Sequence, residues 1–422
     1  MSRDGPLRVA LLVYRGNPYS GGQGVYLHHL SRELRDLGHH VEVFSGPPYP
    51  NLVPGVTLVR VPSLDLYRPE DPFRTPRLAE LRRPVDALEF ALMCTAGFPE
   101  PLTFSLRARA LLARRSRDFD VVHDNQCLGY GIAALTTHGL PVVATVHHPI
   151  TVDRALDLAH AGSWQRRLTL RRWYGFVRMQ KRVVRRLPRV ITVSECSARD
   201  ISTQMGVRRD RLVVIPVGVD PTHFRPCPEV SRVPGRIMTT ASADVPLKGL
   251  LPLIEAVAKV RTERPAELVV VGRPRDGSRV PQAVEDLGLD GAVHLVGEVD
   301  GRRMVELYAE ADVAVVPSLY EGFSLPAVEA MACGVPLVST TGGALPEVVG
   351  TDGDTALLVP PGDSGALATA IGTLLDDADL RRRLGAAGRR RVLQRYTWQA
   401  AARATADQYR EVLDEVAAGR RC

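Results

Sequence analysis

The sequence predicts an α/β protein built from two Rossmann-like, doubly wound lobes. Short apolar runs of strand length alternate with helical patterns along most of the 422 residues. This alternation occurs twice, once on each side of a turn-rich stretch at 217–222, and the last helical pattern has no strand after it. Strands that alternate with helices form parallel sheets, which bind ligands at the carboxyl ends of their strands. We therefore expect a ligand in a cleft between the two lobes.

The first lobe begins with a strand–helix–strand unit. Residues 7–13 form a nearly continuous apolar run, typical of a buried parallel strand. A glycine-rich turn at 20–24 precedes a helical pattern that ends at Gly38. The further strands of this lobe are expected at 41–44, 56–61, 121–123, 142–147 and 190–193.

The second lobe repeats the alternation. Its strands are expected at 237–240, 268–272, 293–296, 313–317, 336–339 and 356–359. A long final helix is expected from 397 to 416. We accordingly divide the chain into 1–217, 218–396 and a terminal helical segment, 397–422.

Composition and charge exclude several classes of protein. The chain is 45% hydrophobic and 24% charged, which excludes disorder as a description of the whole. No run approaches the roughly 20 uncharged apolar residues of a membrane span, and we expect a cytoplasmic protein without a signal peptide. The six cysteines form no CxxC pair, so a zinc ribbon is not indicated. Residues 1–217 carry 31 basic and 19 acidic groups, whereas 218–422 carry 23 and 28, so the two lobes differ in net charge.

The densest motif lies between Pro317 and Gly334. A strand ends at Pro317, and a helix is predicted to begin near Leu325, so the amides of 322–325 would lie at a helix N-terminus, where anions bind. Glu321 precedes this point and Glu329 follows it. The two carboxylates can accept hydrogen bonds from sugar hydroxyls, or they can serve only to stabilise the helix dipole.

Glu321 and Glu329, with seven residues between them, resemble the EX7E motif of retaining GT-B glycosyltransferases of family 4. Further short segments resemble motifs of the same family, namely the glycine-rich turn, Thr145-Val146-His147, Ile215–Asp220, Leu247-Lys248-Gly249 and Val296–Val299. The likeness covers nearly the whole chain. It implies the GT-B fold, a nucleotide-sugar donor that is UDP- or GDP-linked, and a hydroxyl acceptor that is a lipid-linked or a glycan intermediate. It also implies a final helix that packs back on the N-terminal lobe.

The resemblance assigns the donor to 218–396. It implies that Lys248 binds the diphosphate, that Glu321 orients the sugar, that Glu329 holds the ribose and that the backbone at Val299 meets the base. The family places an Arg where this chain has Ser242, so Arg273 beside Gly272 is a candidate replacement for that charge. The other donor contacts expected are Gly22 and the amides of Phe323, Ser324 and Leu325.

The resemblance assigns the acceptor to 1–217. The family pattern selects His147, at the end of a strand, as a catalytic group together with Lys248 and Glu321. Polar residues at neighbouring strand ends are candidate acceptor contacts, namely Gln23, Asp124, Asn125, Gln126 and His148. A front-face displacement with retention is the family expectation.

The family resemblance also implies that the enzyme needs no metal and no cofactor beyond the donor. The DxD sequences at 118–120, 352–354 and 377–379 are explained by turns and surface. A basic amphipathic helix at 166–189 leaves two alternatives, peripheral contact with the anionic inner face of the membrane or packing on the sheet. The apolar segment 86–104 is an acceptor-side lid or pocket, or additional core. No nucleic-acid-binding module accompanies the basic charge.

Two other functions fit the same motifs. A nucleotide-sugar epimerase on this fold would convert the donor without an acceptor. A non-catalytic transferase-like partner subunit would keep the fold, and Ser242 leaves this alternative open, whereas Lys248, Glu321 and Glu329 favour an enzyme.

Overall fold

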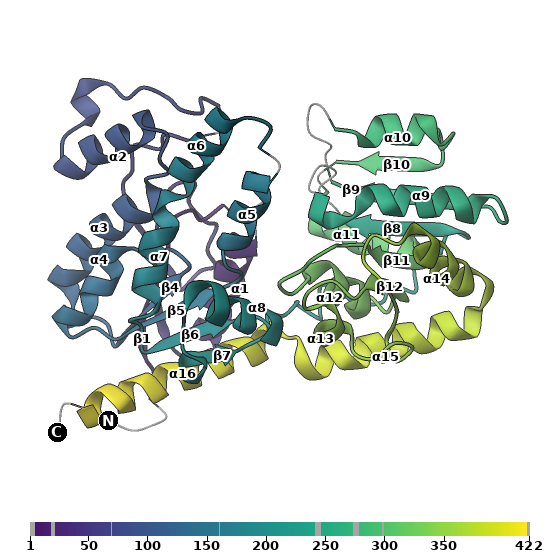
Figure 1. Ribbon diagram of the computed structural model, residues 1–422. Coiled ribbons are helices and arrows are strands. Elements are labelled where there is room, and N and C mark those ends of the chain that lie inside the picture. The colour runs from purple at the N-terminus through teal and green to yellow at the C-terminus, as the bar shows by residue number, and fades with distance from the viewer. Residues whose placement is uncertain are drawn as a thin grey trace. The chain divides into compact units, whose positions relative to one another are not determined.

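A computed structural model describes residues 5–17, 22–68, 70–159, 161–240, 246–272, 278–297 and 299–419. The chain divides into two compact units (Figure 1). The first comprises 1–193, 197–215 and 401–422, and the second comprises 194–196 and 216–400. Each unit holds one parallel sheet, as the alternation of strands and helices predicts.

The first sheet has seven strands in the order β3-β2-β1-β4-β5-β6-β7. They are β1 (Arg8–Val13), β2 (His40–Ser45), β3 (Thr57–Arg60), β4 (Val121–Asn125), β5 (Val142–Val146), β6 (Arg189–Thr192) and β7 (Leu212–Val214). All pairs are parallel; in the centre Leu11 pairs with Val43 on one side and His123 on the other. The strand β7 was not among the expected strands, because three residues are too few to give a pattern.

The second sheet has six strands in the order β10-β9-β8-β11-β12-β13, also parallel. They are β8 (Arg236–Thr240), β9 (Glu267–Val271), β10 (Val293–Val296), β11 (Val313–Val316), β12 (Leu337–Thr340) and β13 (Ala356–Val359). Every expected strand of this half is present within one residue at each end. Both sheets have the doubly wound order in which the first strand lies beside the fourth.

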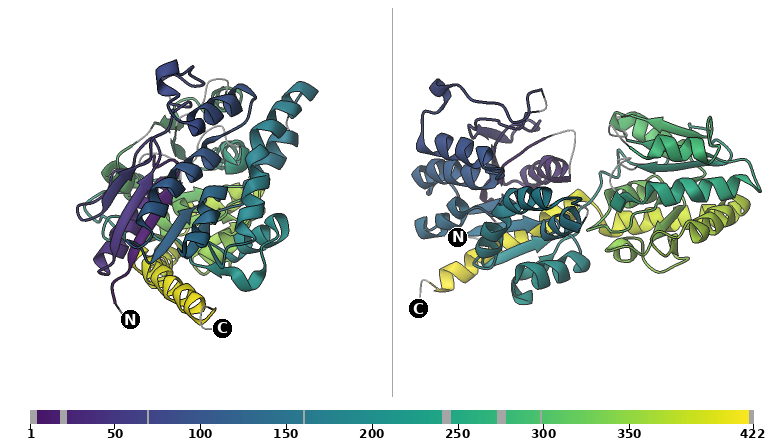
Figure 2. Two further views of the ribbon diagram at one scale, coloured as in Figure 1. Left: turned by 90° about the vertical axis from the view of Figure 1, so that its left-hand side faces the viewer. Right: turned by 45° about the horizontal axis from the view of Figure 1, so that its top comes forward.

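Helices connect the strands of the first unit (Figure 2). They are α1 (Gly22–Asp36), α2 (Pro84–Cys94), α3 (Glu100–Leu112), α4 (Tyr130–Ala133), α5 (Thr151–Ala159), α6 (Trp164–Trp173), α7 (Val177–Val184), most of α8 (Glu195–Asp200) and most of α16 (Trp398–Gly419). The last helix, yellow in Figures 1 and 2, belongs to the first unit from Ala401 onward, which confirms its expected return.

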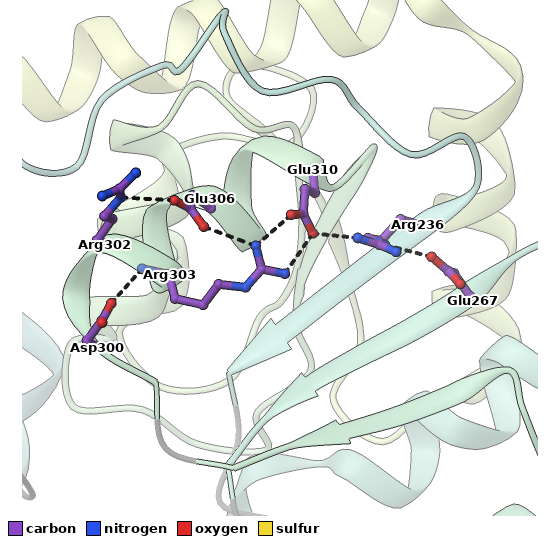
Figure 3. Close-up of polar contacts among 7 residues, drawn as sticks. All are labelled: Arg236, Glu267, Asp300, Arg302, Arg303, Glu306 and Glu310. Carbon is purple, nitrogen blue, oxygen red and sulfur yellow. Dashed lines mark hydrogen bonds and ion pairs between the residues drawn. The ribbon is translucent and has the colours of Figure 1, made fainter.

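The second unit contains α9 (Leu250–Arg261), α10 (Val280–Asp286), α11 (Gly301–Glu310), α12 (Leu325–Ala332), α13 (Leu345–Val349), α14 (Ser364–Asp376) and α15 (Ala378–Arg395). The first turns of α11, α12, α14 and α15 are capped by side chains that accept from backbone amides, for example Asp300 at α11 and Asp363 at α14. An ion-pair network joins α11 to β8 and β9, with Arg236 between Glu267 and Glu310 (Figure 3).

Each unit has its own apolar core. In the first, strand residues such as Val122 and Ala144 pack against helix residues such as Ile132 and Val184. In the second, Ile237 and Val315 pack against Leu253 and Ile371. Burying each such large side chain stabilises the fold by ~1.5–3 kcal/mol, which explains the continuous apolar runs of the central strands.

The expected basic helix at 166–189 is two helices. A single 3₁₀ turn, Tyr174–Phe176, separates α6 from α7. The second, α7, follows the packing alternative, because Val177, Val183 and Val184 are buried in the core. In α6 only Leu170 is buried.

Among the described residues, no helix combines the length and hydropathy that crossing a bilayer requires.

Candidate functional site

The strand order places Lys248 and Glu321 at the switch point of the second sheet, and His147 one strand from the switch point of the first. In the second sheet β8 and β11 are neighbours, and the chain leaves their carboxyl ends toward Lys248 and Glu321, respectively. In the first sheet β1 and β4 are neighbours, and β5 lies beside β4. His147 directly follows β5. Ligands of doubly wound sheets bind at these positions.

Lys248 and Glu321 form an ion pair in the second unit. The Lys248 Nζ lies 2.7 Å from Oε1 of Glu321. The hydroxyl of Ser318 donates to the same oxygen over 2.8 Å. The lysine side chain is 32% exposed and the glutamate side chain 12%. Solvent can therefore reach the ammonium, whereas the carboxylate is mostly buried.

Two close backbone approaches fix this pair. Gly249 has φ of 65°, and a Cβ there would lie 2.0 Å from the carbonyl oxygen of Pro317. Gly343 also has φ of 65°, and a Cβ there would lie 2.3 Å from the carbonyl oxygen of Glu321. Only glycine satisfies both the left-handed backbone and the contact. The amides of Leu319 and Ala344 complete the frame by donating to Leu247 O and Glu321 O.

The helix α12 begins beside this pair, at the expected residue. Ser324 is its N-cap, and the Ser324 hydroxyl accepts from the amide of Ala327. Ser324 has φ of 92°, an uncommon conformation for a residue other than glycine that is found at ligand-binding turns. Among the hydrogen bonds of the described residues, none is donated by the amides of Phe323, Ser324 or Leu325. These amides therefore remain donors at a helix N-terminus.

Glu329 lies one turn into α12 and faces Tyr308 of α11. The Tyr308 hydroxyl donates to Oε2 of Glu329 over 3.2 Å. Burial raises the pKa of Glu329 to about 7, and the bond from Tyr308 partly offsets this rise. Near neutral pH this carboxyl can therefore both donate and accept.

Of the other predicted donor contacts, Gly272 and Val299 are described. Gly272 directly follows β9 with φ of 147°, and its amide donates to Val296 O. Val299 follows β10 and is half-buried. Ser242 and Arg273 lie outside the described residues, so the proposed replacement of the family arginine has no structural account.

In the first unit, His147 is held by two side chains at the carboxyl end of β4, those of its last residue, Asn125, and of the next residue, Gln126. Its backbone amide donates to Oε1 of Gln126 over 2.7 Å, and its Nε2 lies 2.8 Å from Oδ1 of Asn125. The amide oxygen accepts, so Nε2 carries the hydrogen and Nδ1 keeps its lone pair. Burial, and next the charge of His148, lower the pKa of His147 to about 3. The ring is neutral at physiological pH.

The turn after β4 positions these side chains. The Asp124 carboxylate accepts from the amides of Cys127 and Leu128, and burial raises the pKa of Asp124 to about 7. Gln126 and Leu128 have φ of 58° and 53°, which the Asp124 bonds hold in place. Asp124, Asn125 and Gln126 are fully or almost fully buried. In the structure all three side chains bond groups of the protein itself, and their expected contact with an acceptor stays a prediction.

Asn125 also reaches the glycine-rich turn. Its Nδ2 donates to the carbonyl oxygen of Gln23 over 3.1 Å. The neighbouring Gly24 is required there, because a Cβ would lie 1.8 Å from Asn17 O. Gly22 is the first residue of α1. The predicted acceptor residue His148 is half-exposed and its Nε2 lies 2.8 Å from Asp153.

A buried polar chain, not anticipated from the sequence, lies behind His147. The Tyr409 hydroxyl of α16 contacts Nδ1 of His123 at 2.5 Å, and Nε2 of His123 contacts Thr145 Oγ1 at 2.7 Å. Thr145 in turn bonds Tyr26, whose ring packs edge-on against His147 with centroids 4.7 Å apart. Burial lowers the pKa of His123 to about 3, and the charge of His147 adds to this.

The sequence analysis also did not identify two residues of the second-unit site, Tyr308 and Ser318, because a single tyrosine or serine carries no pattern.

Among the described residues, no three His, Cys, Asp or Glu side chains are grouped so that they could hold a metal ion.

Two family models match the chain. Residues 20–223 match Glycosyltransferase Family 4, and residues 234–377 match Glycosyl transferases group 1. The chain therefore belongs to family 4 of the GT-B glycosyltransferases and is a glycosyltransferase.

Named relatives support this assignment. The chain is 52% identical to "MMP alpha-(1->4)-mannosyltransferase" of Mycolicibacterium hassiacum, over 98% of this chain and 100% of the relative. It is 30% identical to "D-inositol 3-phosphate glycosyltransferase" of Kineococcus radiotolerans, over 98% and 97% of the two chains.

Solved structures share the fold. Sucrose-phosphate synthase from Thermosynechococcus elongatus aligns with a TM-score of 0.70 at 24% identity, covering 97% of this chain and all of that one. Anabaena HepE in complex with UDP and glucose aligns with a TM-score of 0.68 at 20% identity, covering 95% and 99%.

Proposed function

We propose that this glycosyltransferase moves a mannosyl or related hexosyl group from a UDP- or GDP-linked donor to a hydroxyl of a glycan acceptor, with retention of anomeric configuration. The observation that carries the proposal is the pairing of Lys248 with Glu321 beside the free amides of α12. The mannosyl group and the glycan acceptor follow from the 52% identical relative, a mannosyltransferase.

The proposed chemistry starts with the diphosphate. Lys248 is a partly exposed ammonium, and the amides of Phe323, Ser324 and Leu325 are donors at a helix N-terminus. Both stabilise negative charge that develops on the leaving phosphate, and they do so without reorganising. An incoming diphosphate competes with Glu321 for Lys248, which releases the Glu321 carboxylate to accept bonds from sugar hydroxyls.

The remaining donor roles follow the family expectation. Glu329 holds the ribose, and its pKa of about 7 lets it act as donor or acceptor toward a hydroxyl. The backbone at Val299 meets the base, and Gly272 and Gly22 allow close backbone approach. We propose that the reaction needs neither a metal nor a further cofactor.

His147 acts as a neutral ring in this scheme. Its Nδ1 lone pair can stabilise positive charge at the anomeric carbon, which a protonated imidazole could not do. Neither its ring nor Glu321 is needed as a nucleophile if the departing phosphate takes the acceptor proton in a front-face displacement.

The test is transfer from a panel of UDP- and GDP-linked hexoses to manno-oligosaccharides, with D-inositol 3-phosphate as a second acceptor. Product formation, and its anomeric configuration by NMR, are measured together with release of nucleoside diphosphate. Transfer to oligosaccharide with an α-linkage from an α-linked donor supports the proposal. Conversion of the donor without acceptor would instead identify an epimerase, and transfer only to the inositol phosphate would overturn the glycan acceptor.

A further inference from the structure

The first unit contains a cavity that the proposed reaction does not use. Its volume is about 790 Å³, and α2, α3, α6 and α7 supply most of its walls. This is the size of pocket in which proteins enclose small molecules. The segment 86–104, for which the sequence left a pocket or extra core open, contributes Leu92 and Phe98.

The walls of the cavity are largely apolar. Phe98 packs against Trp173 and Phe176, with ring centroids 5.0 and 5.5 Å apart. Leu102 and Met179 continue this surface. A site of this kind favours an alkyl or aromatic group over a sugar, whose hydroxyls would lose hydrogen bonds to water there.

Positive charge is concentrated around the same cavity. Five of its lining residues are arginines, and none of its lining residues is Asp or Glu: Arg154, Arg171, Arg172, Arg178 and Arg182. Arg172 donates to Thr95, and Arg182 donates to the Tyr130 hydroxyl. Both partners are uncharged, so neither arginine is neutralised.

The other three arginines are unpaired. Within the described ranges, Arg154, Arg171 and Arg178 form no ion pair and no side-chain hydrogen bond, and the buried Nε of Arg154 has no partner. In the second unit, by comparison, Arg236 and Arg303 each contact carboxylates (Figure 3).

The positive charge of these arginines also affects a neighbouring lysine. Lys181 lies on α7, and its pKa is lowered by burial and then by the charges of Arg185 and Arg154. Unrelieved repulsion of this kind stabilises an anion that binds among the cations.

We propose that this cavity binds a single-chain amphipathic anion, in which an alkyl chain lies against the apolar walls and a phosphate group meets the arginines. Guanidinium groups bind phosphate oxygens in pairs, and a phosphate monoester brings about −1.5 to −2 charges to a rim of several cations. The rim is also apolar on one side, where Leu168 of α6 is 60% exposed. The proposal concerns the first unit alone and does not depend on the donor or acceptor proposed above.

The experiment measures binding of dodecyl phosphate, below its critical micelle concentration, to the full-length protein by isothermal titration calorimetry. We expect one bound molecule per chain. Inorganic phosphate and the neutral dodecyl maltoside should each bind at least about ten-fold more weakly, because each lacks one half of the ligand. Equal binding of either one overturns the proposal.

A charge variant tests the location. Arg171 and Arg178 are exposed, so the double variant Arg171→Gln, Arg178→Gln should fold normally. We expect it to weaken dodecyl phosphate binding about ten-fold or more. The matched control is Arg383→Gln, Arg390→Gln, which removes the same charge from exposed positions on α15. Equal effects of the two double variants would show nonspecific attraction and overturn the proposal.

A second arm identifies the source of such a ligand. Vesicles of phosphatidylglycerol are added to the complex with dodecyl phosphate, with phosphatidylcholine vesicles as the control. Displacement by phosphatidylglycerol alone supports a bilayer lipid entering the cavity, and no displacement supports a free amphiphile. Binding to the anionic vesicles without any binding of monomeric dodecyl phosphate overturns the cavity and leaves only surface attraction.

Discussion

The Nζ of Lys248 lies 2.7 Å from Oε1 of Glu321, so two charged residues from separate family motifs are each other's partner. Ser318 donates to the same Glu321 oxygen over 2.8 Å. The pair is partly exposed, and such pairs contribute only ~0–1 kcal/mol to folding. Its position at the switch point of the sheet is therefore better explained by ligand binding than by stability.

Removing the ammonium should weaken nucleotide binding. In Lys248→Met, the affinity for UDP or GDP should fall about 10- to 100-fold, since a charge-assisted hydrogen bond to phosphate is lost. The melting temperature should change little. Lys259→Met is the matched control, because Lys259 lies in the same unit and its Nζ contacts only Ser364 among the described side chains. Titration calorimetry with each nucleotide makes the comparison, and equal affinities for the two variants would remove Lys248 from the donor site.

Neutralising the carboxylate should separate binding from transfer. Glu321→Gln keeps the side-chain shape and leaves Lys248 without its anionic partner. We expect nucleoside diphosphate to bind at least as tightly as before, while kcat for transfer falls about 100-fold or more because the sugar is no longer oriented. Initial rates and nucleotide affinities are measured on the same preparation. Unchanged transfer would sink the assigned role of Glu321.

The glycine contacts offer a test of how the pair is held. Gly343→Ala must accommodate both φ of 65° and a Cβ 2.3 Å from the Glu321 carbonyl oxygen. We expect it to lose roughly 2 kcal/mol or more of unfolding free energy and to lower transfer as well. Gly353→Ala has a similar φ of 78° but open space around the new Cβ, so it should lose only ~1 kcal/mol and keep full activity. Urea unfolding and initial rates give both quantities, and equal losses in the two variants would contradict the role of the close contact.

Much of the fold follows from the sequence, because central parallel strands are apolar on both faces. The run 7–13 and the run 313–317 are examples, and both lie in the middle of a sheet. The edge strand β7 and the break after Trp173 did not follow, since three residues carry no period and the 3₁₀ turn at 174–176 interrupts a sequence that is helical in composition.

The candidate site was predictable only where residues form a motif. Recognisable sequence motifs contain Glu321, Lys248 and His147. By contrast, the partners of Tyr308 and His123 are remote in sequence, so these contacts arise only when the chain folds. Asn125 and Gln126 were correctly noticed as polar residues at a strand end. Their bonds to His147 could not be anticipated, because a one-residue change in the turn would direct them elsewhere.

The buried histidines should make stability depend on pH. Folding lowers the pKa of His123 from 6.5 to about 3, so below pH 6.5 the unfolded chain binds a proton that the folded chain excludes. This destabilises the fold by ~1.4 kcal/mol for each pH unit below the unfolded pKa. His123→Gln lacks this contribution, so the stability advantage of the wild type over the variant should shrink by about 2 kcal/mol between pH 7 and pH 5.

Comparing the two proteins at each pH removes the opposing contributions of Asp124, Glu100 and Glu329, whose raised pKa values are common to both. Chemical denaturation at pH 7, 6 and 5 measures the difference. The exposed His138→Gln controls for the loss of one histidine. A difference that stays constant for His123→Gln would show that His123 is not kept neutral by the fold.

Asn125 links the two parts of the first unit that the proposed reaction requires, since its amide contacts both the His147 ring and the Gln23 carbonyl oxygen. Asn125→Leu preserves the volume and removes both bonds, so kcat should fall about ten-fold or more with a smaller change in KM for the donor. The matched control is Gln180→Leu, which deletes a buried amide that bonds the same turn at Gln126 O and Cys127 O without touching His147. Both variants cost stability, so the melting temperature alone cannot separate them, whereas kcat can. If the two variants lose kcat equally, Asn125 serves only to hold the turn, and if Asn125→Leu loses much more, the orientation of the His147 ring is what the amide provides.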